Sequence, residues 1–258
     1  MLILVYGLPK SASTFAAELC RDLARAAGHD QEALREKYLG PDSGGGYVSN
    51  LPSLVELAGR MARDDLLVLK THSPRMPELA ALEADGVLRT LVTYRDPRDA
   101  ALSAFEAGKK ARESGDQSQG FYRLETLDDA IGFIARHINK VTRSWLLAPH
   151  ALKLQYGYLT RSPLHAAADI ARFIGLDDPA IVDAAKELAN GEKRVYNFNV
   201  GQIGRYKDVF SPAQLAMVTE SLADYLAFCA GRKDELKDCV VPDAEQASNP
   251  LSKNTEPL

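Results

Sequence analysis

Residues 1–15 read MLILVYGLPKSASTF, and this stretch decides the fold. The apolar run from Met1 to Tyr6 has the length of a buried strand, and it passes through the turn-forming segment 7–14 into an apolar-periodic stretch. This order is typical of a parallel strand, a tight loop and a helix N-terminus. The backbone N–H groups of such a loop, together with the positive end of the helix dipole, favour an anion. The sequence therefore predicts a phosphate-binding loop at residues 7–14.

The position of the lysine restricts the kind of phosphate ligand. A nucleoside-triphosphate P-loop follows the pattern GxxxxGK[ST], which would place glycine at position 12 and lysine at position 13. The chain has Ala12 and Ser13 there, and its lysine is Lys10. The loop instead resembles the 5′-phosphosulfate loop of sulfotransferases that use 3′-phosphoadenosine 5′-phosphosulfate (PAPS), P-K-S/A-G-T-T/S followed by an aromatic residue. It departs from that pattern at Ala12, where the family usually has glycine, and at Phe15, where it often has tryptophan.

The resemblance implies that this loop binds the phosphosulfate end of PAPS. We expect the hydroxyls of Ser11, Ser13 and Thr14 to add hydrogen-bond donors, and Lys10 to neutralise charge that develops on the bridging phosphate oxygen. The binding residues that the resemblance implies here are Pro9, Lys10, Ser11, Ala12, Ser13, Thr14 and Phe15. The alternative interpretation of Lys10 is an ordinary solvated loop lysine.

A histidine follows the second predicted strand, Leu66 to Lys70. The run Lys70-Thr71-His72-Ser73-Pro74 comes at the carboxyl end of this strand, where open parallel sheets bind their ligands. It resembles the K-T-H-x-P segment of the same family, which implies that His72 is the general base that deprotonates an acceptor hydroxyl. Imidazole suits this task because its pKa lies near neutrality. The alternative is a structural histidine at a strand end.

A cationic segment follows the third predicted strand, Val87 to Tyr94. The spacing from Arg95 to Ser103 resembles the family's 3′-phosphate segment, R-[ND]-P-[RK]-D-x-x-x-S, which implies that these two residues hold the 3′-phosphate of PAPS. A guanidinium donates two parallel hydrogen bonds to a phosphate, and a hydroxyl two helical turns later can reach the same anion. We interpret Arg98 and Asp99 as a surface cation and a helix-start anion, not as ligands.

Two later segments resemble the family less closely. Tyr156 follows the fourth predicted strand, residues 151–155, and stands where the family has Y-E-D-L, which implies a contact with adenine. Residues 198–211 resemble the loop R-K-G-x-x-G-x-W-K-x-x-F-[TS], in which the backbone N–H of Gly201 is expected to donate to the 3′-phosphate. Asn-Val at positions 199–200 replaces the family's Arg-Lys pair, and Arg194 and Arg205 are the candidates to substitute for it.

Composition narrows the possible partners. The net charge of −4 and the pI near 5.8 argue against nucleic acid as a partner, and no apolar run approaches the ~18 residues of a membrane span. The three cysteines, Cys20, Cys229 and Cys239, lack metal-ligand spacing, so no metal is expected. The first strand carries no leading basic region, so we do not interpret it as a signal peptide and expect a cytoplasmic protein.

The sequence thus predicts a three-layer, P-loop-like α/β fold with a parallel sheet flanked by helices, formed by one domain over residues 1–240 and followed by a disordered tail, 241–258. Loops 40–50 and 106–125 are expected to shape the acceptor site, the second as a polar segment without regular structure. The resemblance implies a sulfotransferase that moves a sulfuryl group from PAPS to a hydroxyl of a small molecule, glycan or lipid and releases the bisphosphate PAP. The alternatives are a P-loop-type kinase using ATP and a non-catalytic nucleotide-binding module.

Overall fold

The structure, a computed structural model, describes residues 1–41, 44–190 and 202–236. The chain divides into two compact units. The first unit is Met1–Tyr94 with Ser144–Gly201, and the second is Arg95–Arg143 with Gln202–Leu258. The tail predicted at residues 241–258 lies outside the described residues.

The first unit contains a parallel sheet. Its strands are β1 (Leu2–Gly7), β2 (Leu67–Thr71), β3 (Leu88–Tyr94) and β4 (Leu152–Gln155). Their order across the sheet is β2-β1-β3-β4, and every pairing between them is parallel. Every residue of β1 is buried, as the continuous apolar run predicted. The parallel sheet and the four strand positions expected from the sequence are confirmed.

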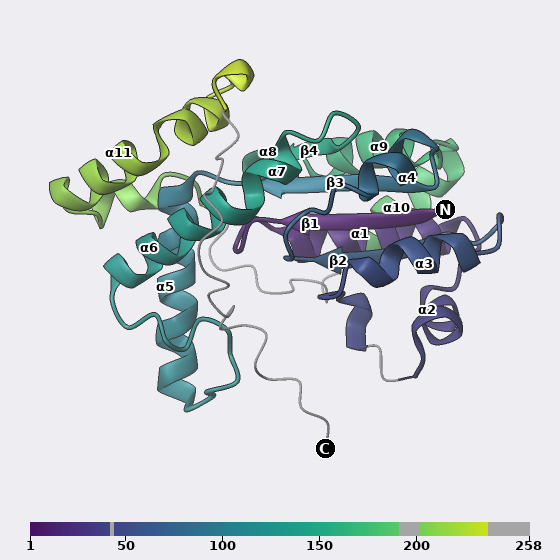
Figure 1. Cartoon of the computed structure of the whole chain (residues 1–258), viewed down its shortest axis with the longest axis horizontal. Coiled ribbons are helices and arrows are strands. Elements are labelled where there is room, and N and C mark those ends of the chain that lie inside the picture. Colours follow the sequence, from purple (N-terminus) through teal and green to yellow (C-terminus); the bar gives the residue numbers. More distant parts are fainter. Residues whose placement is uncertain (42–43, 191–201, 237–258) are drawn as a thin grey trace. The chain divides into compact units, whose positions relative to one another are not determined.

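Helices cover both faces of this sheet (Figure 1). Ile3 and Val5 of β1 share a core with apolar residues of α1, α9 and α10. The alternate side chains point to the other face, where the Tyr6 ring stacks on the Trp145 ring at a centroid distance of 4.9 Å. The helices of this unit are α1 (Ser13–Ala26), α2 (Gln31–Leu39), α3 (Pro52–Arg60), α4 (Leu79–Ala84), α8 (Tyr156–Arg161), α9 (Pro163–Ile174) and α10 (Pro179–Asn190), and α7 (Arg143–Leu146) begins at the boundary between the units.

The second unit is helical in its described part. It is built from α5 (Pro97–Ser114), α6 (Leu127–His137) and α11 (Pro212–Cys229), with the short 3-10 turns η3 (Arg205–Asp208) and η4 (Lys233–Glu235). A π-helical turn, Ile138–Thr142, follows α6. Arg143, directly after this turn, is buried and forms a bidentate ion pair with Asp224 of α11. Among the described residues of the chain, every helix is too short or too polar to cross a bilayer.

The structure corrects the expectation of an irregular segment from residue 106. Helix α5 continues to Ser114 and ends at Gly115, whose φ of 70° is a left-handed helix cap. The stretch GKKARES lacks an apolar stripe but consists mostly of good helix formers, so its helicity was not visible as periodicity. The turns that follow are tied back to the helix, because Arg112 donates to the carbonyls of Tyr122 and Leu124 at 2.8 and 2.7 Å.

Candidate functional site

The predicted phosphate loop joins β1 to α1 with strained backbone. Lys10 and Ala12 both have φ of 67°, a region that side-chain-bearing residues rarely adopt. Gly7 permits a close approach at the start of the loop, since a Cβ there would lie 2.3 Å from Ser13 Cβ and 2.5 Å from Thr93 Oγ1. Helix α1 starts at Ser13 without a side-chain cap. The loop therefore has the geometry expected of an anion cradle, with first-turn N–H groups that lack intrahelical acceptors.

Ser11 differs from the prediction. Its side chain is buried, and its hydroxyl lies 2.6 Å from the Leu8 carbonyl, 3.1 Å from the Thr93 carbonyl and 2.7 Å from Thr93 Oγ1. The hydroxyl thus ties the loop to the end of β3 and is not a donor directed at a ligand. The sequence pattern identified the loop but did not show which of its hydroxyls form hydrogen bonds inside the protein instead of pointing at a ligand.

His72 lies directly after β2, beside the start of the phosphate loop. Its Nδ1 atom is 2.7 Å from the carbonyl oxygen of Gly7. A carbonyl only accepts hydrogen bonds, so Nδ1 carries the proton and Nε2 holds the basic lone pair in the neutral ring. The carbonyl of Gly7, the last residue of β1, therefore fixes this tautomer of His72.

Lys70 is a residue of this site whose importance the sequence did not reveal. Its ammonium group donates to Thr14 Oγ1 at 2.9 Å. Burial, the neighbouring Arg21 and, to a smaller extent, Lys10 lower the pKa of Lys70 to about 8. Glu18 partly opposes this shift of the pKa. Lys70 is partly buried, and its bond to Thr14 joins β2 to the start of α1. Its place in the Lys-Thr-His run was the only available signal.

Tyr47 is the aromatic residue that lies beside His72. The two ring centroids are 5.9 Å apart, and residue Tyr47 is 47% exposed. Its backbone pairs with that of Lys70, and Val48 N–H donates to the Lys70 carbonyl at 2.8 Å. Arg21 of α1 supports the preceding glycines by donating to the Gly45 carbonyl at 2.9 Å. The described part of segment 40–50 therefore adjoins the end of β2 that carries His72.

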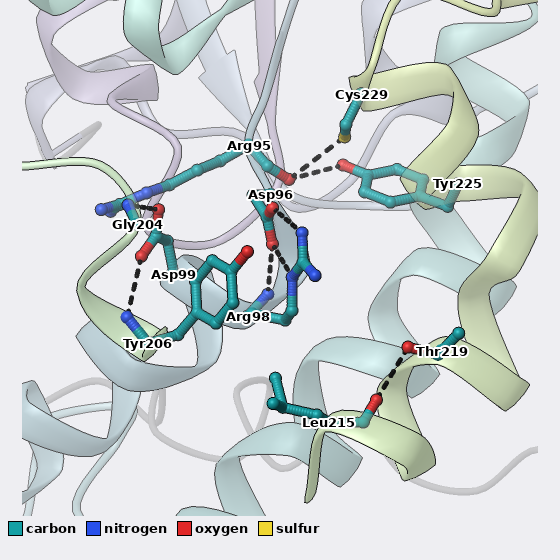
Figure 2. A network of polar contacts seen from close by, with 10 residues as sticks. All are labelled: Arg95, Asp96, Arg98, Asp99, Gly204, Tyr206, Leu215, Thr219, Tyr225 and Cys229. Carbon is teal, nitrogen blue, oxygen red and sulfur yellow. Dashed lines mark hydrogen bonds and ion pairs between the residues drawn. The ribbon is translucent and has the colours of Figure 1, made fainter. Parts of the chain in front are cut away.

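The second unit carries the predicted 3′-phosphate residues. Arg95 is 6% exposed and Ser103, on α5, is 4% exposed. The carbonyl oxygen of Arg95 accepts from the Tyr225 hydroxyl at 3.3 Å and from the Cys229 thiol at 3.7 Å. Figure 2 shows these contacts converging on the Arg95 backbone from the end of α11. The guanidinium of Arg95 donates to the Gln202 carbonyl at 3.2 Å.

Asp99 corrects the interpretation of this residue as a simple helix-start anion. It is 2% exposed, and its carboxylate accepts from the Gly204 N–H at 2.7 Å and the Tyr206 N–H at 3.5 Å. Arg98 pairs with Asp96 and lies over the Tyr206 ring, 4.1 Å from its centroid. The first turn of α5 therefore holds the described loop 202–206, as Figure 2 shows.

The remaining predicted residues are distributed as follows. Tyr156 begins α8 and is 7% exposed, in the first unit. Arg205, a candidate to replace the family's Arg-Lys pair, is engaged in an ion pair with Glu106. Gly201, Arg194 and residues 199–200 lie outside the described residues. Within the described ranges, no group of three or more His, Cys, Asp or Glu side chains is arranged to hold a metal ion.

Comparisons with known proteins identify the family. The model of the sulfotransferase domain matches residues 2–220. Retinol dehydratase in complex with androsterone and the inactive cofactor PAP is 16% identical, with a TM-score of 0.54 over 93% of this chain and 82% of that chain. Mouse sulfotransferase SULT7A1 complexed with PAP is also 16% identical, with a TM-score of 0.53 over 91% of this chain and 87% of that chain. A search of curated proteins gave no match.

The chain belongs to the sulfotransferase domain family, because the family model covers most of its length. The two similar structures, at their low identity, support the fold alone. The family match confirms the resemblance that was based on the loop, the Lys-Thr-His run and the Arg95 segment. Sulfuryl transfer is the activity of this family. Nothing in the comparisons supports the kinase alternative.

Proposed function

We propose that this protein is an enzyme that transfers a sulfuryl group from PAPS to a hydroxyl acceptor and releases PAP. The observation that carries the proposal is the arrangement around Gly7. The strained loop that starts there supplies Lys10, and the Gly7 carbonyl holds the proton on Nδ1 of His72. An anion-binding loop and an oriented base at the ends of neighbouring strands are the two elements that this transfer requires.

The residues of the first unit fit the phosphosulfate end of PAPS. Lys10 and Lys70 bring positive charge to the loop, and burial lowers the pKa of Lys70, as is expected where the compensating anion comes from a ligand. The residues we propose to contact this end are Pro9, Lys10, Ala12, Ser13, Thr14 and Phe15, with Ser11 supporting the loop. Arg95 and Ser103 are proposed to hold the 3′-phosphate, with the Gly201 N–H as a further donor, and Tyr156 to contact the adenine.

PAPS supplies the sulfuryl group, whose bond to the bridging phosphate oxygen breaks as its sulfur–oxygen bond to the acceptor forms. His72 takes the acceptor proton on Nε2, because Nδ1 is already protonated toward Gly7. Lys10 stabilises the negative charge that develops on the phosphate oxygen.

We propose a hydroxyl of a small molecule, glycan or lipid as acceptor. We also propose a single catalytic domain over residues 1–240 and a cytoplasmic location.

The test is a thermal-shift titration of the full chain with PAP, ADP and ATP·Mg²⁺. A ligand at 100 times its Kd stabilises the folded protein by ~2.7 kcal/mol. PAP is expected to shift Tm strongly and ADP weakly, because only PAP carries the 3′-phosphate. Equal shifts for PAP and ADP would remove the 3′-phosphate assignment, and a larger shift with ATP·Mg²⁺ would support the kinase alternative. PAP binding without transfer from PAPS to any hydroxyl acceptor would indicate a non-catalytic nucleotide-binding module.

A further inference from the structure

We propose that Asp99 is a positioning residue for recognition of the 3′-phosphate, acting through the loop 202–206 on the guanidinium of Arg95. The inference rests on the proposed function, because it assumes that Arg95 binds the 3′-phosphate of the donor. Asp99 itself does not touch the nucleotide in this scheme. It holds the loop to which the Arg95 side chain is attached.

The first step of the argument is the unusual use of the Asp99 carboxylate. An acidic residue at the third position of a helix commonly accepts from the N–H of its own N-cap residue. In α5 the N-cap residue is Asp96, whose carboxylate accepts from the Arg98 N–H at 2.9 Å. The Asp99 carboxylate instead accepts from the N–H groups of Gly204 and Tyr206, more than a hundred residues later in the chain.

The second step is that these contacts are buried and specific. Asp99 is 2% exposed, so its carboxylate depends on hydrogen bonds for stabilisation, and a charge-assisted bond to a backbone N–H is among the stronger ones. Gly204 has φ of +83°, a left-handed conformation that glycine adopts without strain and that starts the turn η3. The Tyr206 ring is buried beneath Arg98. The loop conformation is therefore fixed at Gly204 and Tyr206.

The third step connects the loop to Arg95. The carbonyl of Gln202, two residues before Gly204, accepts from Arg95 Nη2 at 3.2 Å. Figure 2 shows the Arg95 side chain extending toward the loop that carries Gly204. At its other end, the Arg95 backbone accepts from Tyr225 and Cys229. An arginine held at both ends loses less conformational freedom when it binds a phosphate, and its planar donors keep one orientation.

The experiment compares the Kd values for PAP and ADP by calorimetry on the full chain. Asp99→Ala is expected to weaken PAP binding by about 10-fold or more, the effect of losing a charge-assisted hydrogen bond. ADP binding should change by less than about 2-fold, because ADP lacks the 3′-phosphate and its affinity does not depend on Arg95. Asp99→Asn should give a ratio of the Kd for ADP to the Kd for PAP between those of the wild type and Asp99→Ala, because the amide oxygen of asparagine can still accept one N–H. Arg95→Ala should abolish the preference for PAP.

Asp129→Ala is the matched control. Asp129 is also a carboxylate of the second unit that accepts from a backbone N–H, that of Thr126, in the capping box of α6. Its loss destabilises a helix of the same unit without touching the loop 202–206. The ratio of the two Kd values should remain that of the wild type. A ratio that falls equally in Asp129→Ala and Asp99→Ala would show a general effect of stability and overturn the proposal.

A measurement on the wild type avoids variants that fail to fold. PAP should slow amide hydrogen exchange at Gly204 and Tyr206 more than ADP does, because the ligand bound to Arg95 stabilises the loop. Equal protection by PAP and ADP, in a protein that prefers PAP, would overturn the role of the loop. A preference for PAP that survives in folded Asp99→Ala would overturn the role of Asp99 alone. A wild type without any preference for PAP would instead overturn the proposed function.

Discussion

At the scale of single residues, the contact between His72 and Gly7 decides how the candidate base works. The carbonyl of Gly7 orients the ring and assigns its proton to Nδ1. The resemblance of the Lys-Thr-His run predicted a base at this position, but the tautomer depends on a strand that lies 65 residues earlier in the chain. The partner of a histidine nitrogen is a tertiary contact and has no local sequence signal.

The substitution His72→Ala tests this residue directly. Turnover should fall by about 10²-fold or more, the usual contribution of a general base, while PAP affinity should remain that of the wild type. The measurement is the rate of sulfuryl transfer from PAPS to an acceptor, together with the Kd for PAP. His165→Ala, at an exposed position on α9, is the matched control and should change neither quantity. Near-normal turnover of His72→Ala would remove His72 from the mechanism.

Lys70 gives a prediction about pH. Its pKa is about 8 in the folded protein and that of an ordinary lysine, 10.5, in the unfolded chain. Between these two pKa values the unfolded state binds more protons than the folded state, so the contribution of Lys70 to the free energy of unfolding increases with pH. Below pH 8 the lysine is charged in both states, and the folded state bears the full cost of burying that charge. A bound phosphate favours the charged lysine. PAP affinity should therefore decrease as pH rises above 8.

Calorimetry between about pH 7 and pH 10 checks this prediction, because the phosphates of PAP are already fully ionised there, with second pKa values near 6. The Kd for PAP should rise with pH by at most about tenfold per unit. In Lys70→Arg this dependence should be absent, since a guanidinium stays charged throughout the range. The same slope in both proteins would assign the titration to another group.

At the scale of elements, α5 shows where sequence patterns were incomplete. Its start was predicted from the segment around Asp99, but its last turns have no apolar stripe and were interpreted as an irregular segment. These turns are held by polar contacts with the segment that follows them, such as Arg112 with the carbonyls of Tyr122 and Leu124. Apolar periodicity predicts helices that pack on a core, and it fails for helix ends held by polar contacts.

Gly108 provides a test of the packing of α5. A Cβ at this position would lie 2.3 Å from the carbonyl oxygen of Phe121, a backbone atom that cannot move easily. Gly108→Ala should therefore destabilise the protein by about 1–3 kcal/mol, the usual cost of overpacking, although alanine is the better helix former. The free energy of unfolding in urea measures the effect.

Gly132→Ala in α6 is the matched helical control. The nearest atom to its added Cβ is Arg136 Nη1 at 3.1 Å, the end of a flexible side chain. Because that side chain can move, the gain in helix propensity should prevail, and the protein should become more stable by about 0.5–1 kcal/mol. Stabilisation by both substitutions would contradict the close approach of Phe121 to α5.

At the scale of the whole molecule, the chain consists of two units whose segments alternate along the sequence. The first unit holds the phosphate loop, Lys70 and His72, and the second holds Arg95, Ser103 and the loop beside Asp99. The predicted 3′-phosphate segment begins at the residue where the chain passes from one unit to the other. The residues predicted to bind the two phosphate groups are therefore divided between the two units.

The sequence by itself determined the strand–loop–helix of the first fifteen residues, the four strands and the family, because these depend on local apolar patterns and on short motifs. Only the tertiary structure decided that Ser11 supports the loop, that Lys70 bonds to Thr14 and that Asp99 holds a distant segment. The physical reason is that hydrogen bonds and desolvation act between residues far apart in the chain. Such contacts leave no periodic pattern in the sequence, and only folding brings their partners together.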